Sequence, residues 1–394
     1  MRPRRLCTTL LYGILILVAC DAPATDEENP LEGLPEASLT ETLRLGGADA
    51  PEAEAFDVPP SLAVDPEGRL YALHRGRAQV ALFDPEGSFV HWVAGAGSGP
   101  GEFTIPVRLG LVGDTLWVGD GVSQRISRFG PDGAHLSTRT APWDFGIPMG
   151  APQSEGGYLE GGRVWAEPTA RPLGIEGRID LPVLVGPPGL ATADTLFHVR
   201  VPRRNLQGLF WAAFEVPPYH AVAPDGSGIL LAEWDPASPA TVELRFFDPG
   251  GQVTREATLP VPVRPMTSER RNEAIEEGTA QIEALGERLR ESGLAEAGIP
   301  QPDRSITEAQ LYLPENVPPI RRVQVGLDGS WWLQLADDME AGPWLALDPE
   351  GIPRFTLHLP DEATLGLARL DRVWGITTDD FDVPRVVRWE LEVP

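Results

Sequence analysis

Short apolar runs separated by Asp-Pro-x-Gly turns recur along this 394-residue chain, and this repeat limits what the chain can fold into. The first unit holds four apolar runs within residues 60–98, and two of its turns read Asp-Pro-Glu-Gly. Proline fixes φ and glycine permits positive φ, so such tetrapeptides are typical of tight turns between antiparallel strands. These two turns and their later counterparts lie at 65–68, 84–87, 130–133, 223–226, 248–251, 327–329 and 348–351. The pattern predicts an all-β fold made of repeated four-stranded units.

The spacing of the turns predicts how many units there are. Phe83 and Phe129 precede equivalent turns and lie 46 residues apart, which is the length of one blade of a β-propeller. Without an expected insertion at 264–316, residues 60–394 hold six units of about 47 residues each. The predicted blades span 60–98, 104–143, 145–202, 210–262, 317–360 and 361–394. We therefore expect a six-bladed β-propeller with four-stranded blades.

The last predicted blade contains only three apolar runs, at 364–370, 373–378 and 385–391. A spare apolar segment, Leu39–Leu45, precedes the first blade, and we expect it to supply the fourth strand. Closure of the ring by an N-terminal strand removes the open edges that a linear stack of sheets would leave.

The insertion at 264–316, between blades 4 and 5, predicts a helix from about Ser268 to Glu291. Its apolar residues recur at intervals of seven, three and four, which places them on one helical face: Ile275, Ile282, Leu285 and Leu289. Gly293 is a plausible end signal. Two interpretations remain open: a surface helix packed on blades 4 and 5, or a lid or partner-docking element over the mouth of the propeller.

The N-terminus is typical of a secreted lipoprotein. Three arginines precede an uncharged apolar run, Leu6–Ala19, which is too short to span a membrane. The run ends in Leu17-Val-Ala-Cys20, which resembles the bacterial lipobox, in which the cysteine is acylated. We therefore predict a signal peptide at 1–19, lipidation of Cys20, an acidic flexible tether at 20–37 and the propeller at 38–394. This predicts a protein of the cell envelope that is attached to a membrane through its lipid anchor.

The charge balance excludes some partners. The chain has 58 acidic and 32 basic residues, and every basic residue is arginine, for a net charge of −26. Nucleic acid would be repelled, so we expect no nucleic-acid partner. Two cysteines cannot build a disulfide framework.

Several motifs resemble those of the NHL-type six-bladed β-propellers. Gly95-Ala-Gly-Ser-Gly-Pro-Gly101 is similar to the loop between blades of that family, while Leu116–Asp120 and Gln124–Phe129 are similar to its blade strands. The resemblance covers about 60–140 well and the C-terminal part weakly. It implies a fold that hosts both enzymes and binding modules, and so it implies no single function.

The propeller topology places one set of candidate residues at the top face, where the second and third strands of each blade are joined. These residues end the second strands: His74, Asp120, Glu233, Asp337 with Asp338, Asp379 with Asp380, and Glu167 as the candidate from blade 3. A ring of carboxylates suits a hard cation such as Ca²⁺. We treat Asp120, Glu233, Asp337 and Asp379 as candidate metal ligands of a metal-dependent hydrolase or lyase. The alternative is that they are solvated loop residues.

A second set lies at the beginning of inner strands: Arg108, His220, Arg321 and Arg322. An arginine there can bind a carboxylate or sulfate, or it can pair with Asp337 or Asp338 as part of the scaffold. No Gly-x-Ser-x-Gly motif supports serine catalysis. We therefore predict a non-catalytic module whose top face binds a small molecule, a glycan or a protein. The hydrolase or lyase is the alternative.

Overall fold

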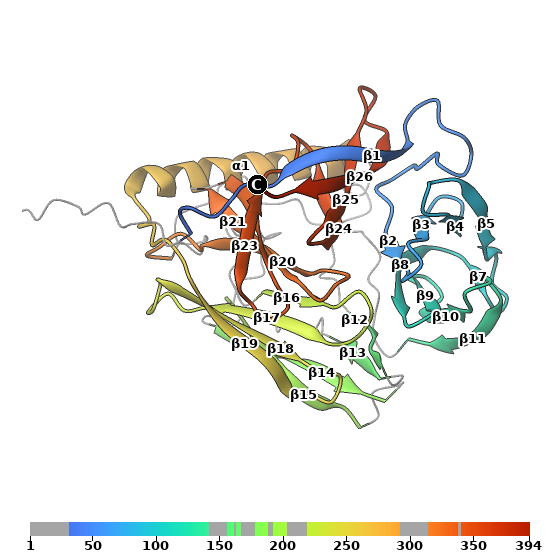
Figure 1. Cartoon of the computed structure of the whole chain (residues 1–394), viewed down its shortest axis with the longest axis horizontal. Helices are drawn as coiled ribbons and strands as arrows, with labels where there is room; N and C mark the ends of the chain where they lie inside the picture. The colour runs from blue at the N-terminus through green and yellow to red at the C-terminus, as the bar shows by residue number, and fades with distance from the viewer. Residues whose placement is uncertain are drawn as a thin grey trace, which may run out of the picture.

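The computed structural model describes residues 31–141, 156–160, 163–166, 178–187, 192–202, 219–291, 314–337 and 340–394. These residues form six four-stranded antiparallel sheets arranged in a ring (Figure 1). The predicted all-β, six-bladed propeller is thereby confirmed. Among the described residues, no helix is long and apolar enough to cross a membrane.

The blades are numbered along the chain, and their strands run from the inside of the ring to the outside. Blade 1 contains β2 (Leu62–Val64), β3 (Leu70–His74), β4 (Gln79–Phe83) and β5 (Phe89–Val93); blade 2 contains β8 (Pro106–Val112), β9 (Thr115–Asp120), β10 (Arg125–Phe129) and β11 (His135–Thr140). Blade 3 contains β12 (Gly156–Tyr158), β13 (Val164–Ala166), β14 (Arg178–Gly186) and β15 (Asp194–Pro202); blade 4 contains β16 (Tyr219–Val222), β17 (Ile229–Trp234), β18 (Thr241–Phe247) and β19 (Val253–Pro260). Blade 5 contains β20 (Ile320–Val325), β21 (Trp331–Asp337), β22 (Glu340–Leu347) and β23 (Pro353–Leu357).

Blade 6 is completed by the N-terminal strand, as predicted. It contains β24 (Thr364–Arg369), β25 (Arg372–Thr378), β26 (Pro384–Glu392) and β1 (Ser38–Gly46), which includes the expected segment. The two terminal strands pair in antiparallel register from Ser38 opposite Glu392 to Gly46 opposite Arg385. A short parallel pair, β6 (Gly95–Ala96) and β7 (Glu102–Phe103), lies in the connection between blades 1 and 2.

The recurring turns take the conformation that their glycines permit. Each turn glycine has a φ between +78° and +88°, a region that side-chain-bearing residues rarely adopt; these are Gly68, Gly87, Gly133, Gly226, Gly251, Gly329 and Gly351. Each turn connects the first and second strands, or the third and fourth strands, of its blade. They therefore lie on the face opposite the predicted top.

The helix α1 spans Ser268–Glu291, the same range that the sequence predicts. Ala274 is fully buried and Ile275 is half-buried. The side chains of the other predicted stripe residues, Ile282, Leu285 and Leu289, lie outside what the structure describes. The choice between a packed surface helix and a lid thus stays open.

Residues 31–37 differ from the expected flexible tether. Leu31 and Ala37 are buried, with exposed fractions of 8% and 5%. Thr356 of β23 donates its backbone N–H to Pro35 O (2.9 Å) and accepts a bond from Ala37 N (2.8 Å). This segment therefore covers part of the outer edge of blade 5 instead of moving freely, because its apolar side chains and backbone groups both find partners. Residues 20–30, including Cys20, lie outside the described residues.

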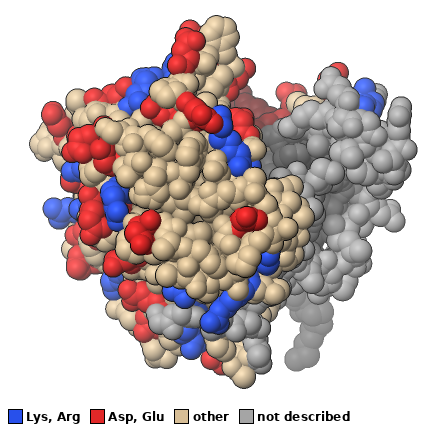
Figure 2. Space-filling view, turned by 90° about the vertical axis from the view of Figure 1, so that its right-hand side faces the viewer, with Lys and Arg blue, Asp and Glu red and all other residues tan. Residues whose placement is uncertain are grey.

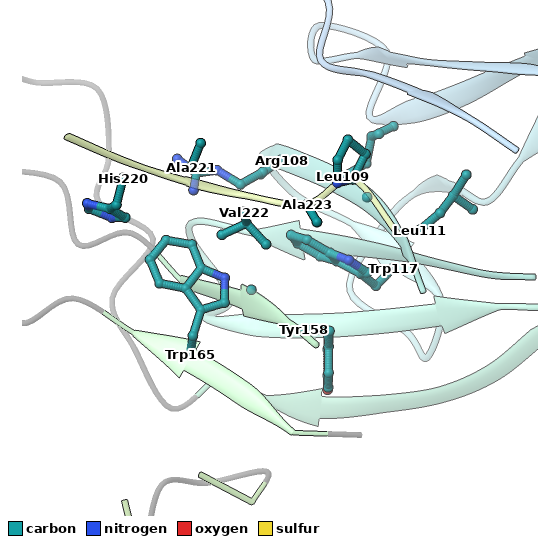
Figure 3. Close-up of a pocket in the computed structure, with 13 residues that line it drawn as sticks. Arg108, Leu109, Leu111, Trp117, Tyr158, Trp165, His220, Ala221, Val222 and Ala223 are labelled. Carbon is teal, nitrogen blue, oxygen red and sulfur yellow. The ribbon is translucent and has the colours of Figure 1, made fainter. Parts of the chain in front are cut away.

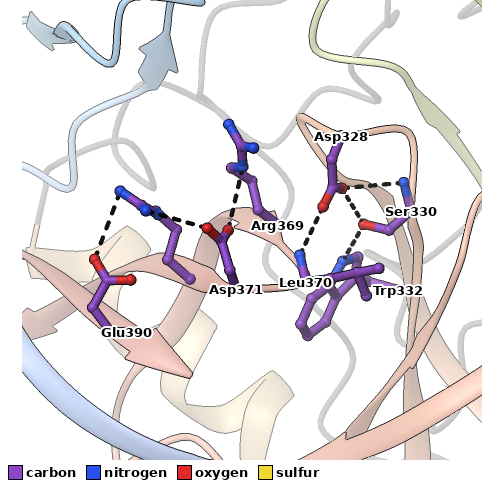
Figure 4. A network of polar contacts seen from close by, with 8 residues as sticks. Asp328, Ser330, Trp332, Arg369, Leu370, Asp371 and Glu390 are labelled. Carbon is purple, nitrogen blue, oxygen red and sulfur yellow. Dashed lines mark hydrogen bonds and ion pairs between the residues drawn. The ribbon is translucent and has the colours of Figure 1, made fainter. Parts of the chain in front are cut away.

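A buried polar network joins blades 5 and 6 (Figure 4). Asp328 accepts hydrogen bonds from Leu370 N (2.8 Å) and from Ser330 Oγ (2.5 Å), and Ser330 Oγ accepts one from Trp332 Nε1 (2.9 Å). Ser330 and Trp332 are fully buried. Beside this network, the exposed Asp371 pairs with two arginines of β24 and β25. The buried part fixes the position of one blade on the next.

The acidic residues are unevenly spread over the surface. Figure 2 shows a broad area with few charges on the side formed by blades 1 and 2. The outer strand β5 carries no charged residue, and its Phe89 and Val90 are 41% and 49% exposed. Leu136 of β11 is 56% exposed. The side formed by blades 1 and 2 therefore exposes an apolar area with few charges.

Candidate functional site

A cavity of about 230 Å³ lies among the inner strands of blades 2, 3 and 4 (Figure 3). Its described lining comes from β8, β9, β12, β13, β16 and the residues that directly follow β16. The lining residues are Arg108, Leu109, Gly110, Leu111, Trp117, Gly157, Tyr158, Trp165, His220, Ala221, Val222, Ala223 and Pro224. The cavity is thus built from three consecutive blades of a rigid scaffold.

Two glycines on inner strands make room for two indole rings. Gly110 lies opposite Trp117 in the β8–β9 pair, and Gly157 lies opposite Trp165 in the β12–β13 pair. Directly opposed residues of an antiparallel pair point to the same face of the sheet, so each indole leans over its glycine. A Cβ atom at Gly110 would lie 2.8 Å from Trp117 Nε1, and one at Gly157 would lie 2.9 Å from Trp165 Nε1. Any side chain at either position would therefore displace an indole.

The aromatic rings of the cavity contact one another edge to face. Trp117 and Tyr158 have ring centroids 6.1 Å apart, and Trp165 and His220 have theirs 5.7 Å apart. Such contacts fix the ring orientations. Burial raises the pKa of Tyr158, although the nearby Arg128 and Arg139 act in the opposite direction. The phenol is therefore neutral at physiological pH, and its ring packs against Trp117.

Arg108 and His220 bring the polar character of the cavity. They lie near the beginning of β8 and of β16, at the top end of these inner strands. Figure 3 shows both side chains on the same part of the lining, with His220 next to Trp165. No Asp or Glu occurs among the described lining residues, although the whole chain has 58 acidic residues.

The structure brings together two of the four predicted ligand-binding residues. Arg108 and His220 line one cavity, whereas Arg321 and Arg322 of β20 are not among its lining residues. Arg322 occupies the register position in blade 5 that Arg108 occupies in blade 2, directly after a bulge in the inner strand. The same position in two blades thus has two different surroundings.

Asp120, a predicted metal ligand, is engaged with backbone groups. Its carboxylate is buried (2% exposed) and accepts hydrogen bonds from the N–H groups of Thr104 (2.5 Å), Ile105 (3.2 Å), Val122 (3.0 Å) and Ser123 (2.8 Å). Burial alone would raise the pKa of Asp120, but the bonds from Ser123, Thr104 and Ile105 outweigh it and hold that pKa below its ordinary value. Asp120 therefore holds together two top-face loops of blade 2.

Asp379 has a similar arrangement in blade 6. It accepts hydrogen bonds from the N–H groups of Ala48 (2.8 Å), Phe381 (2.9 Å) and Val383 (3.0 Å), and it faces Arg385 at 3.6 Å. Desolvation would raise the pKa of Asp379, and these bonds and Arg385 lower it below its ordinary value. The carboxylate fixes the loop between β25 and β26 against the connection that follows β1.

The other predicted acids lie apart. Glu233 forms an ion pair with Arg245 across β17 and β18, and Asp337 is exposed at the end of β21. Asp380 is exposed, while Asp338 and Glu167 lie outside the described residues. Among the described residues, no three His, Cys, Asp or Glu side chains are grouped as a metal ion would require. The structure thus does not bring the four candidate ligands together.

His74 is buried inside blade 1, with an exposed fraction of 1%. Its ring lies 4.7 Å from that of Phe56 and 5.1 Å from that of Trp92. Its Nε2 lies 2.9 Å from Ala53 O, and it donates its proton there in the tautomer that this contact favours. Burial lowers the pKa of His74, and the hydrogen bond to Ala53 acts against that shift. His74 therefore anchors the connection that follows the ring-closing strand.

The aromatic residues of the cavity were not singled out by sequence reasoning. In the sequence alone, Trp117 and Trp165 are typical of packing residues in strands, and Tyr158 belongs to no motif. The feature that identifies the two tryptophans is a glycine at the opposing position of the inner strand. This feature can be recognised only when the pairing register of the two strands is known. Gly110 and Trp117 flank a short turn, so their register could be inferred; blade 3 has no such turn motif.

Most of the chain is similar in fold to several solved structures. A member of the DUF4221 family from Bacteroides vulgatus is 9% identical, with a TM-score of 0.48, and the match covers 92% of this chain and 99% of that one. A Bacteroides fragilis protein named as exported is 11% identical, with a TM-score of 0.46 over 90% of this chain and 95% of that one. The virginiamycin B lyase of Staphylococcus aureus is 11% identical, with a TM-score of 0.40 over 90% and 100% of the two chains. Comparison with protein-family models finds no match, and comparison with curated proteins finds none either. These likenesses are of the fold, and they place the chain in no family.

Proposed function

We propose that this chain is an extracytoplasmic, lipid-anchored β-propeller that binds a small molecule without catalysing a reaction. The observation that carries the proposal is the cavity among the inner strands of blades 2, 3 and 4. It combines apolar and aromatic walls with two polar groups, Arg108 and His220, which is the usual composition of a small-molecule site. A protein partner would need a larger surface than this small hollow offers.

The chemistry of the lining favours binding over catalysis. Hydrolysis needs an activated nucleophile or a pair of acid and base groups at the reacting atoms. The described lining contains neither a carboxylate nor a thiol, and its hydroxyl group is the phenol of Tyr158, whose pKa is raised by burial. These side chains recognise a ligand more readily than they transform one.

The binding proposal is tested by isothermal titration of the purified full-length protein with a panel of small ring compounds. The panel consists of glucose, glucuronate, phenol, benzamide and benzoate. Val222→Phe adds bulk to the lining, and Val253→Phe, at a residue of β19 that is 44% exposed, adds the same bulk elsewhere. We expect at least one compound to bind the wild type and Val253→Phe, and to bind Val222→Phe at least about tenfold more weakly. If no compound binds, or if Val222→Phe binds as well as the wild type, the cavity is not a binding site for small ring compounds.

The anchor is tested separately, because it rests on the lipobox-like residues Leu17–Cys20. Two or three acyl chains hold a protein firmly on a membrane, whereas a single chain binds marginally. We expect the wild type in the membrane fraction of the producing cells. Cys20→Ser cannot take the thioether-linked lipid, and we expect it outside the membrane fraction. Metabolic labelling with palmitate should mark the wild type and not Cys20→Ser. Equal labelling of both proteins would contradict the anchor.

A further inference from the structure

The outer edge of blade 1 carries no charged side chain. Its strand β5 is the last of the sheet, and among the described residues no further strand pairs with its outer side. It belongs to a run, Ser88–Gly101, that contains no Asp, Glu, Lys or Arg in a chain of which 23% is charged. Phe89 and Val90 of this run are exposed, and so is Leu136 of β11. We call the run and Leu136 together the uncharged edge.

The two parts of the uncharged edge adjoin each other. A Cβ atom at Gly133, in the turn that leads into β11, would lie 2.9 Å from Nε2 of His91 in β5. A Cβ atom at Gly101 would lie 2.8 Å from the ring of His135 in β11. The outer strand of blade 2 therefore begins against the run that contains β5. Figure 2 shows the resulting surface as a broad area with few charges.

The outer strands of the other blades are protected differently. All five contain charged residues: Glu41 and Arg44 of β1, Arg139 of β11, Asp194 and Arg200 of β15, Arg255 and Glu256 of β19, and Arg354 of β23. The edge of β23 is also covered by residues 35–37 through backbone hydrogen bonds. Charged residues and covering segments keep edge strands from pairing with other chains. Strand β5 has no charged residue, and no described segment covers it, so its edge is open to another strand.

The membrane cannot cover this edge if Cys20 carries the proposed anchor. Leu31 packs in the core of blades 4 and 5, which lie across the ring from blades 1 and 2 (Figure 1). The chain from Cys20 to Leu31 spans at most about 40 Å when fully extended. A compact domain of this length is about 50 Å across. The bilayer that holds the anchor is therefore confined to the opposite side of the propeller.

The charge of the chain favours the same edge of a second copy. Two copies with a net charge of −26 repel each other, and the repulsion is weakest where neither surface carries charges. Antiparallel pairing of one strand with itself across a two-fold axis is self-complementary. It would place Phe89 and Val90 of both copies in one contact, and apolar cross-strand pairs stabilise a sheet. Any other outer strand would bring charged residues of both copies together.

We infer that the uncharged edge binds the uncharged edge of a second copy, with the two β5 strands antiparallel across a two-fold axis. The backbone groups on the outer side of β5 then gain partners. Both anchors can enter one membrane, because each N-terminal segment would leave about 25 Å above the bilayer, within the reach of the tether. The dimer goes beyond the proposed small-molecule binding and does not depend on it, since the cavity is built from inner strands of blades 2, 3 and 4.

Sedimentation velocity of the purified full-length protein, from about 1 to 100 μM, tests the dimer. We expect a dimer whose dissociation constant is several-fold lower at about 500 mM NaCl than at about 50 mM, because salt screens the repulsion between the copies. Val90→Glu should raise the dissociation constant at least about tenfold, since it places like charges opposite each other. Val253→Glu is the matched control, because it adds the same charge at the 44% exposed start of β19; it should dimerise as the wild type does.

Three outcomes would overturn the dimer: a monomer under all these conditions, weaker association at high salt, or equal association of Val90→Glu and the wild type. The second outcome would show that ion pairs hold the copies together, and the third that the contact lies elsewhere. Hydrogen exchange of the wild type at low and high concentration adds a test without a variant. The β5 amides should become protected in the dimer, and unchanged exchange there would exclude the strand pairing. None of these results affects the ligand panel that tests the cavity.

Discussion

Gly110 lies directly opposite Trp117 across the inner two strands of blade 2, and a Cβ atom at Gly110 would come within 2.8 Å of the indole nitrogen. Gly157 and Trp165 repeat this relationship in blade 3, at 2.9 Å. In each pair the indole occupies the space that a side chain at the glycine would fill. The pairing thus sets where the two indoles lie in the cavity wall, and it occurs in two neighbouring blades.

Gly110→Ala should therefore harm both stability and binding. The added methyl group would push against Trp117, which is buried and packed against Tyr158. Overpacking of this kind costs about 1–3 kcal/mol. We expect chemical denaturation followed by circular dichroism to show a loss of that size. Gly95→Ala is the control, because a Cβ there would meet nothing within 4 Å, and a similar loss in both variants would contradict the account.

Asp120→Asn should destabilise blade 2. The carboxylate accepts four backbone hydrogen bonds, and the amide group of asparagine cannot accept all of them. We expect a loss of about 3 kcal/mol in the free energy of unfolding. Asp114→Asn, at an exposed position in the neighbouring turn, should change it by less than about 0.5 kcal/mol.

The same carboxylate predicts an acid dependence. The pKa of Asp120 in the folded protein lies below its ordinary value of 3.8, so its stabilising contribution is present above about pH 4. This contribution is lost as the pH falls below 3.8 and through the folded pKa. Denaturation midpoints measured from pH 5 to pH 2 should fall less steeply in Asp120→Asn than in the wild type. Parallel curves would show that Asp120 does not contribute in this way.

His74 should make the protein sensitive to milder acid. Burial lowers the pKa of His74 below its ordinary value of 6.5, so the folded state holds the ring neutral. The protonated ring is favoured in the unfolded chain, and stability is therefore full above about pH 6.5 and decreases as the pH falls from there towards the folded pKa. We expect the melting temperature to decrease from pH 7 to pH 5, with a smaller decrease in His74→Leu. A decrease in His74→Leu as large as that of the wild type would contradict this role of His74.

Ser330→Ala should weaken the junction of blades 5 and 6. The buried indole N–H of Trp332 would lose its acceptor, which costs about 1–3 kcal/mol. Asp371→Asn removes exposed ion pairs beside the same network and should cost less than about 1 kcal/mol. Equal losses in urea denaturation would mean that the buried hydrogen bond is not what holds the junction.

Most of the fold could be predicted from the sequence because its signals are local. Each Asp-Pro-x-Gly turn fixes the boundary of two strands, and the apolar stripe of α1 marks that helix by itself. The docking of residues 31–37 could not be predicted in this way. Their composition is that of a tether, and the contacts of Leu31 and Ala37 come from blades that lie far along the chain.

The site could be predicted only in part. Arg108 and His220 were identified because they begin inner strands, where side chains converge near the axis. The strand ends also pointed to Asp120 and Asp379, but the sequence does not show that backbone N–H groups surround both carboxylates. Trp117 and Trp165 resemble ordinary packing residues until the register places a glycine opposite each of them.

The most direct test of the account is a crystal structure of the protein grown with 4-iodobenzoate, with the iodine located by its anomalous signal. We predict an iodine peak in this cavity, next to Trp117, Trp165 and Val222. The same anomalous data would also reveal iodobenzoate bound in other pockets, such as the one lined by Gly47, Asp379 and Arg385. A peak there, or no peak in the cavity of blades 2, 3 and 4 at a saturating concentration, would contradict the account.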